Sequence, residues 1–382
     1  MKKQKICIIG GSLAGLTTAI SLSRLDCEID LIAGNLSKNL SSNRTIAISE
    51  NNFDYLNKLN ISKGLRKESW ACSKMKLYTE VKDKKFSEIF VINKENKKEN
   101  IFYTLENKKI MKLMIKKIEK IKSISLKKNQ KVLSISTKGL LNSVKFKNKI
   151  QKYNLIIVCT GYNSDLIKNI FQQKIIKSSY GEIAITTILK HFPTKNNTTR
   201  QIFLDDSIFA FLPISHTKTS IVWSVKKSGK VIKNSSLRKK IKFYTSNFIK
   251  NIKFIENIEH NDLNLFIREK YFTKRILLFG DALHVMHPFI GQGFNMTLRD
   301  LSSLEQILLK KIKLGLDIGG SDVLSEFTSE VKPRNFIFST GSDFLKKSIS
   351  FKKARNDMFK ILNKSNLAKN IFFNIADKGL RF

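Results

Sequence analysis

The residues with the clearest chemical meaning lie at positions 280–300, in the order G-D-A, H-P-x-x-G-Q-G-x-N and D. The carboxylate of Asp281 can accept hydrogen bonds from sugar-like hydroxyl groups of a ligand. Gly291 and Gly293 have no side chain, so the loop backbone can approach a ligand closely. These residue types suit a long, hydroxyl-bearing cofactor, and a loop without a ligand would not need so detailed a pattern.

A strand, a loop and a helix are needed to position these residues. The apolar run 275–279 predicts a buried strand, and the periodic apolar run 298–309 predicts a helix. The helix N-terminus offers unpaired N–H groups and partial positive charge, which favour an anionic part of the ligand. We therefore expect Gly280 and Asp281 at the end of a strand and the glycine loop at the start of a helix.

The N-terminus carries a second cofactor signal. Residues 6–9 predict a short strand, and a helix of small residues follows. Gly10, Ser12 and Gly15 lie between the two at the spacing of the dinucleotide fingerprint G-x-G-x-x-G, with Ser12 in place of the middle glycine. The next strand lacks the acidic residue that normally holds a ribose hydroxyl. We expect Asn35 to replace it, or that contact to be lost.

Two separate cofactor motifs in one chain resemble the FAD-dependent aromatic-ring monooxygenases of the p-hydroxybenzoate hydroxylase-like fold, and among them the ubiquinone-biosynthesis hydroxylase family. The R-T-I-A-I-S element that begins at Arg44 resembles the family segment whose arginine reaches the FAD phosphates. The E-N-K-K-I element around Asn107 resembles a helix start near the flavin. The Y-G-E element that ends at Glu182 resembles a Y-x-Q segment, with glutamate in place of glutamine.

The resemblance implies FAD as the cofactor and a set of site residues. The implied FAD-binding residues are Gly10, Ser12, Gly15, Asn35, Arg44, Asn107, Gly161, Gly280, Asp281, Gly293, Phe294 and Asn295. The implied catalytic residues are His287, Pro288, Gly291, Gln292 and Gly293. Pro288 is expected to line the reaction pocket, and the backbone N–H groups of 291–293 are expected to stabilise the anionic reduced flavin. A general base, if one is needed, stays open between His284, His287 and Tyr180.

The family has a further, third motif after its third strand of the FAD-binding domain, and this chain differs from it at two positions. Gly161 is present after the apolar run 155–159, but Thr160 stands where the family has aspartate and Ile167 where it has arginine. In relatives this segment supports both FAD and NAD(P)H. We therefore expect FAD to bind, NAD(P)H to reduce the flavin slowly, and a partner protein or complex to reduce it faster. The alternative is that Asp165 and Lys168 take over both roles.

The order of the motifs predicts an α/β fold, in which a Rossmann-like FAD-binding domain carries an inserted, mainly antiparallel β-sheet substrate domain and C-terminal helices. The expected limits are 1–75, 100–178 and 266–330 for the discontinuous FAD-binding domain, 76–99 and 179–265 for the substrate domain, and 331–382 for the helices.

Composition limits the partners. The 382 residues are 42% hydrophobic, which indicates a globular chain, and their formal net charge is +39. Lysine is the dominant basic residue and is dispersed along the chain, which indicates drift in composition rather than a nucleic-acid-binding surface. No nucleic-acid motif accompanies the lysines. The charge would suit weak contact with an anionic membrane surface.

No apolar run is long enough to span a membrane, and glycines interrupt the N-terminal apolar run, which argues against a signal peptide. The four cysteines lack metal-like spacing, so we expect buried thiols in a reducing compartment and no metal site. Together these features predict a cytoplasmic protein that works at the inner membrane surface if its substrate has a lipid tail.

The function implied by the resemblance is hydroxylation of the aromatic ring of a polyprenyl phenol in ubiquinone biosynthesis, with molecular oxygen as co-substrate and a quinone-biosynthesis protein complex as a partner. The apolar runs 208–212 and 220–223 would suit such a hydrophobic substrate, and they could equally be core.

Two other functions stay open. One is a different FAD oxidoreductase of this fold, such as a prenyl reductase or a halogenase, although Trp70 and Trp223 do not form the W-x-W-x-I-P element of halogenases. The other is a non-catalytic flavin-binding assembly protein, which would explain Thr160 and Ile167.

Overall fold

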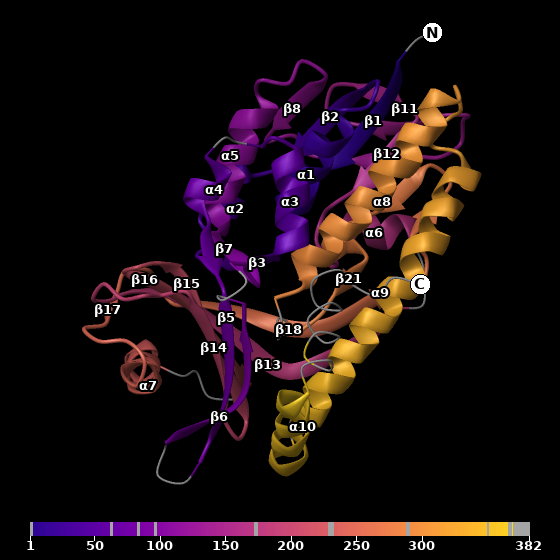
Figure 1. Ribbon diagram of the computed structural model, residues 1–382. Helices are drawn as coiled ribbons and strands as arrows, with labels where there is room; N and C mark the ends of the chain where they lie inside the picture. The colour runs from indigo at the N-terminus through magenta and orange to yellow at the C-terminus, as the bar shows by residue number, and fades with distance from the viewer. Residues whose placement is uncertain are drawn as a thin grey trace.

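The structure is a computed structural model, and it describes residues 3–61, 64–81, 85–94, 98–171, 175–227, 233–287, 291–349, 351–365 and 369. One part of the chain is built on a parallel sheet and another on a large antiparallel sheet, and a long C-terminal helix runs alongside both (Figure 1).

The parallel sheet has the strand order β19-β20-β12-β1-β2-β8. Its members are β1 (Gln4–Ile9), β2 (Cys27–Ala33), β8 (Ile124–Lys128), β12 (Leu155–Val158), β19 (Phe272–Thr273) and β20 (Ile276–Leu278). All pairings are parallel except that between the edge strand β19 and its neighbour β20. Strand β12 and the last four residues of β1 are apolar and buried, as expected for a sheet covered on both faces.

The order of these strands decides where a ligand can bind. The chain runs from β1 to β2 on one side, and it later returns to β12 on the other side of β1. In open α/β sheets, ligands bind beyond the carboxyl ends of the strands at such a switch point. The residues that follow β1 and β12 are Gly10 and Cys159, so the site is expected beside them.

Helices cover this sheet. They are α1 (Leu13–Leu22), α2 (Leu36–Leu40), α3 (Glu50–Lys58), α4 (Leu65–Glu68), α5 (Asn107–Ile118), α6 (Asp165–Ile170) and α8 (Gly293–Lys313). Helix α1 is buried along nearly its whole length and packs against both α5 and α8. All four cysteines are buried, as expected from the sequence.

The large sheet has the order β21-β18-β13-β16-β15-β14-β5-β6, and β17 pairs with β13. Its members are β5 (Lys74–Glu80), β6 (Phe86–Asn93), β13 (Ile175–Lys190), β14 (Thr198–Phe203), β15 (Ser207–Ser215), β16 (Lys218–Lys226), β17 (Lys253–Phe254), β18 (Glu259–Arg268) and β21 (His284–Val285). Only the β14–β5 pairing is parallel. The predicted fold class, a Rossmann-like domain with an inserted antiparallel sheet, is confirmed.

The two faces of the large sheet have different neighbours because side chains alternate along a strand. Phe209, Phe211 and Trp223 share a core with Leu237 and Ile241 of helix α7 (Asn234–Ser246). In Figure 1, α7 lies far from the parallel sheet. The aromatic residues of the runs 208–212 and 220–223 are therefore core, which was the alternative that the sequence allowed.

Two small sheets, the short 3-10 helix η3 (Gly280–Ala282) and two α-helices complete the described chain. The small sheets are β3 (Thr45–Ser49), β7 (Phe102–Glu106) and β4 (Trp70–Cys72), and β9 (Ser134–Ser136), β10 (Asn142–Lys145) and β11 (Ile150–Tyr153). Helix α9 (Ser321–Ile349) runs through residue 331, where the sequence suggested that the C-terminal helices begin, and contains Pro333. Helix α10 (Lys352–Lys364) follows, and its Phe359 packs on the large sheet.

Candidate functional site

The fingerprint glycines lie in the tight turn between β1 and α1. Gly10 has a φ of +136°, which only glycine adopts readily, and a Cβ there would lie 2.7 Å from the Cys159 carbonyl oxygen. A Cβ on Gly15 would lie 1.9 Å from the Gly10 carbonyl oxygen, so no larger residue fits. Ser12, which replaces the middle glycine, donates a hydrogen bond from Oγ to the Cys159 carbonyl at 3.2 Å. The turn is thereby tied to the end of β12.

Gly280 brings the second motif against the first. Its φ is +62°, and a Cβ at this position would lie 2.9 Å from Cβ of Ala14 and 3.5 Å from the side chain of Thr297. Ala14 belongs to α1 and Thr297 to α8, so the strand end, the fingerprint helix and the helix after the glycine loop meet at one point. The two motifs predicted from distant parts of the sequence are therefore adjacent.

Asp281 and Arg44 share this site. The Asp281 side chain is accessible to solvent, yet surrounding protein desolvates its carboxyl and raises its pKa, while His284 and Arg44 oppose that shift. The carboxyl of Asp281 can therefore be reached by a ligand from solvent. Arg44 donates through Nη2 to Asn261 Oδ1 at 2.5 Å, which ties it to strand β18.

Asn295 joins the glycine loop to strand β3. Its Oδ1 accepts from the Ser49 backbone N–H at 3.0 Å and from Asn52 Nδ2 at 3.1 Å. Its Nδ2 donates to the carbonyl oxygens of Ala47 at 2.9 Å and Gly291 at 3.2 Å. Both polar atoms of this buried amide contact protein groups, so its structural role is to hold the loop against β3.

The other predicted residues surround the same strand ends. Asn107 begins α5, and its backbone N–H donates to the Arg44 carbonyl at 2.8 Å. Gly161 follows β12, Gly293 begins α8 and Asn35 follows β2, and a Cβ on either glycine would meet no atom within 4 Å. Phe294 packs on the main core. Pro288 lies outside the described residues.

Four buried polar atoms around these strand ends test whether the site fits FAD. Thr45 Oγ1, Asn107 Oδ1, Thr160 Oγ1 and Gln292 Oε1 have no hydrogen-bond partner in the part of the chain that the structure describes. A buried polar group without a partner costs free energy, so such groups indicate a polar ligand. They come from four separate segments, as an elongated cofactor such as FAD requires, and the residues present fit that cofactor.

The third-motif segment shows two different changes. Thr160 presents its unpartnered hydroxyl beside the site, whereas Ile167 is fully buried in the main core. Asp165 and Lys168, which the alternative expects to replace the missing pair, form an exposed ion pair with each other at 3.2 Å. Position 167, where the family has arginine, therefore lies in the hydrophobic core of this chain.

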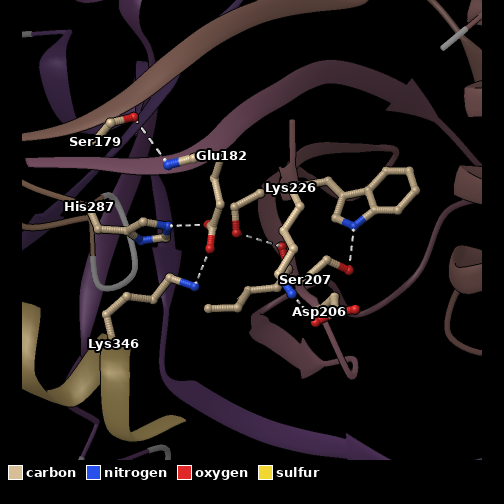
Figure 2. Close-up of polar contacts among 11 residues, drawn as sticks. Ser179, Glu182, Asp206, Ser207, Lys226, His287 and Lys346 are labelled. Atoms are coloured by element: carbon tan, nitrogen blue, oxygen red, sulfur yellow. Dashed lines mark hydrogen bonds and ion pairs between the residues drawn. The ribbon is translucent and has the colours of Figure 1, made fainter. Parts of the chain in front are cut away.

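Sequence reasoning missed a buried charge cluster beside the glycine loop. Figure 2 shows His287 and Lys346 pointing toward the carboxylate of Glu182. His287 Nε2 lies 3.1 Å from Glu182 Oε2, and Lys346 Nζ donates to Oε1 at 2.7 Å. The Tyr180 ring stands edge-on to the His287 ring, with centroids 5.1 Å apart. The sequence marked His287 and Tyr180 as candidate bases and Glu182 as a departure from the family glutamine, but it gave no sign that Lys346 joins them.

His284 has a different environment. Its Nε2 lies 3.3 Å from Asp300 Oδ2, which also accepts from Asn335 Nδ2 at 2.7 Å, and Arg334 Nη2 donates to Asp300 Oδ1 at 3.2 Å. This network connects β21, α8 and α9 in the interior. Of the two loop histidines, His287 is the one that lies beside the Tyr180–Glu182 segment of the large sheet.

Comparison with known proteins decides the family. The FAD-binding domain family matches residues 3–334. The chain belongs to this family. FAD is therefore its cofactor, as the motifs predicted.

Two relatives carry names that bear on function. The chain is 28% identical over 171 residues to ubiquinone hydroxylase UbiL of Rhodospirillum rubrum, with 44% of this chain and 40% of the relative covered. It is 28% identical over 221 residues to the mitochondrial ubiquinone biosynthesis monooxygenase COQ6 of Danio rerio, with 46% and 44% covered. The chain thus spans less than half the length of these two relatives.

Solved structures show the same fold. The p-nitrophenol 4-monooxygenase PnpA of Pseudomonas putida superposes with a TM-score of 0.78 at 15% identity, and 100% of both chains is covered. PqsL of Pseudomonas aeruginosa in complex with 2-aminobenzoylacetate gives 0.77 at 14% identity, with 94% of this chain and 100% of PqsL covered. Within the described residues, no helix is both long and apolar enough to cross a membrane.

Proposed function

We propose that this chain is a FAD-dependent monooxygenase that hydroxylates the aromatic ring of a polyprenyl phenol in ubiquinone biosynthesis. The observation that carries the proposal is the convergence of both FAD motifs at one sheet edge, in a chain whose relatives are named ubiquinone hydroxylases. The antiparallel sheet beside this edge supplies the surface on which an aromatic substrate would lie.

Each part of the site has a binding role. The turn at Gly10 and the N-terminus of α1 receive the anionic pyrophosphate of FAD, because they offer unpaired N–H groups and partial positive charge. Asp281 accepts from hydroxyl groups of the cofactor, and Arg44 adds a positive charge. FAD supplies electron transfer and oxygen activation when bound. The N–H groups of 291–293 and the start of α8 stabilise negative charge on the ring system.

The substrate side is proposed to be apolar. Met286, Met296 and Phe338 form a separate buried cluster between the glycine loop, α8 and α9. The strand residues on the sheet face opposite α7 include the small side chains Ala184 and Ala210. Small residues leave room for a ring, and the methionines adapt to an irregular apolar shape.

A membrane surface is the proposed location of the substrate tail. Phe344 on α9, Phe351 just before α10 and Ile361 on α10 are 70%, 71% and 69% exposed, and basic residues such as Lys347 lie among them. Exposed apolar residues flanked by lysines suit an anionic bilayer. If the protein floats with anionic vesicles and not with neutral ones, this contact is supported. If it floats with neither kind of vesicle, the contact is contradicted.

The proposed function is tested by complementation. Bacterial strains that each lack one ring hydroxylase of ubiquinone biosynthesis would receive this chain, and quinones would be measured by mass spectrometry. Restored ubiquinone in one strain would support the proposal and identify the ring carbon. If purified protein binds FAD but no strain recovers ubiquinone and no phenol is hydroxylated with any reductant, the non-catalytic alternative would stand instead.

A further inference from the structure

We propose that His287 is the general base that removes the hydroxyl proton of the phenolic substrate through Nδ1, and that Glu182 and Lys346 position it. This inference rests on the proposed function, because it requires a phenol as substrate. It assigns a task to a buried ionic cluster that has no part in the FAD-binding roles proposed above.

A β-bulge aims Glu182 at this histidine. Strand β13 pairs with β18 in one register up to Ser179 and resumes at Glu182, so Tyr180 and Gly181 are inserted between the paired residues. Gly181 has a φ of +62° that favours glycine, and its N–H donates to Ser179 Oγ at 3.2 Å. Bulges of this kind redirect side chains, and they are frequent beside active sites.

The cluster fixes the tautomer of His287. The Glu182 carboxylate receives a hydrogen bond from Lys346 Nζ, and the resulting ion pair keeps the carboxylate ionised, so it can only accept from His287 Nε2. The ring proton of a neutral His287 is therefore on Nε2, and Nδ1 carries a lone pair. Nδ1 is buried and has no hydrogen-bond partner among the described residues. A carboxylate that holds one nitrogen and leaves the other basic is the arrangement of a general base.

Burial of the ring keeps His287 neutral near pH 7. Desolvation lowers the pKa of His287 below 6.5, and the positive charge of Lys346 lowers it further, while Glu182 and Asp343 oppose the shift. Burial alone would raise the pKa of Glu182, but the contacts with His287 and Lys346 outweigh burial and bring it below 4.5. Lys346 and Asp343 of α9 and Glu182 of β13 thus all act on the same imidazole. The Tyr180 ring of β13 lies beside it.

The chemistry of a phenol explains why a base is useful. An unperturbed phenol has a pKa of about 10, so only about one molecule in a thousand is ionised at pH 7. In the proposed step the phenolic O–H bond breaks and an Nδ1–H bond forms, which leaves an electron-rich phenolate and an imidazolium ion next to Glu182. No electrons leave the substrate in this step, and the proton returns to solvent after turnover.

The first test replaces His287 by glutamine. Its amide can still donate to Glu182 from the position of Nε2, but it has no basic atom. With 2-geranylphenol as the probe, we expect kcat/KM at pH 7 to fall by about 100-fold or more. Activity should recover as the pH approaches about 10, where the phenol ionises without a base. The matched control is His191→Gln, because His191 is also buried but both its ring nitrogens have protein partners.

The second test uses opposite charge changes. Glu182→Gln restores the family residue and removes a charge that raises the pKa of His287, so the acid limb of kcat/KM should move to lower pH. Lys346→Met removes a charge that lowers this pKa, so the acid limb should move to higher pH, each by about one unit. A purely structural cluster would give no such opposite pair of shifts.

The outcomes separate this inference from the proposed function. If the wild-type protein hydroxylates 2-geranylphenol but His287→Gln keeps its rate and pH profile, the inference is wrong and the proposed function stands. If the wild-type protein binds FAD and hydroxylates no phenol, the proposed function itself fails. FAD content measured by absorbance in every variant shows whether each has folded, and the opposite shifts of the other two variants decide the matter if His287→Gln does not fold.

Discussion

Replacing Asn295 by alanine should destabilise the protein by about 3 kcal/mol, because this amide makes four hydrogen bonds in the interior. It accepts from Ser49 and Asn52 and donates to Ala47 and Gly291, and it is 1% exposed. A hydrogen bond contributes about 1 kcal/mol net, and a buried group left unpaired costs about 1–3 kcal/mol. Asn52 keeps its bond to Ser49 Oγ, which limits the loss.

The substitution Asn295→Asp adds a pH dependence of stability whose direction can be predicted. A carboxylate would keep both acceptor contacts but would face the carbonyl oxygens of Ala47 and Gly291 in place of an N–H donor. Its folded-state pKa should therefore rise above the ordinary value of about 3.9. A raised folded pKa means that the variant loses stability relative to wild type as the pH increases above about 4, and recovers it at lower pH.

The assay is urea unfolding of FAD-free protein, because bound FAD would add its own stabilisation. Asn57→Ala is the matched control, since Asn57 is exposed on the same helix as Asn52 and should change the unfolding free energy by less than about 0.5 kcal/mol. An Asn295→Ala variant that also stays within about 0.5 kcal/mol of wild type, with unchanged FAD affinity, would refute the reasoning.

Four further predictions concern the cofactor site and pH. Gly15→Ala should abolish FAD binding, measured by fluorescence titration, since its Cβ would lie 1.9 Å from a carbonyl oxygen. A Cβ on Gly161 would meet no atom within 4 Å, so Gly161→Ala should leave the unfolding free energy unchanged. Asp281→Ala should weaken FAD binding by about 1.5–3 kcal/mol in the same titration, and an unchanged affinity would contradict its role. Thr160→Asp should speed anaerobic flavin reduction by NADPH in stopped-flow experiments, and equal rates would show that the carboxylate is not what limits reduction. In urea titrations, wild type should lose stability as the pH falls below 6.5. The pKa of His287 is lowered in the folded state, so the unfolded chain binds this proton more readily. His287→Gln lacks this group and should lose less stability over the same pH range.

The cofactor site could be predicted because its signals are local. A glycine that must adopt a positive φ, such as Gly10 or Gly280, lies next to an apolar strand in the sequence itself. Parallel strands bring their carboxyl ends to one edge, so the motifs after β1, β12 and β20 had to meet once the strands were recognised. Asn295 was predicted to lie in the site, but its four contacts depend on the fold of β3, which the sequence does not specify.

The charge cluster could not be predicted in the same way. Glu182, His287 and Lys346 belong to a sheet strand, a loop and a C-terminal helix, and only tertiary packing joins them. Lysine is so common in this chain that Lys346 carries no signal by itself. The bulge at Tyr180 and Gly181 is likewise invisible to period-two patterning, because it becomes apparent only through the register with β18.

The two departures in the third motif have different physical consequences. Ile167 is core, so Ile167→Arg would bury a guanidinium among apolar side chains and would destabilise the fold rather than restore a contact. The structure nevertheless keeps a buried guanidinium beside this segment, since Arg268 of β18 donates to the Tyr162 carbonyl at 3.2 Å and to the Ala282 carbonyl at 2.9 Å. A guanidinium thus lies beside this segment, but it comes from β18 and not from position 167. Only Thr160 leaves the site itself short of a carboxylate, and the electron-donor experiment therefore changes that residue alone.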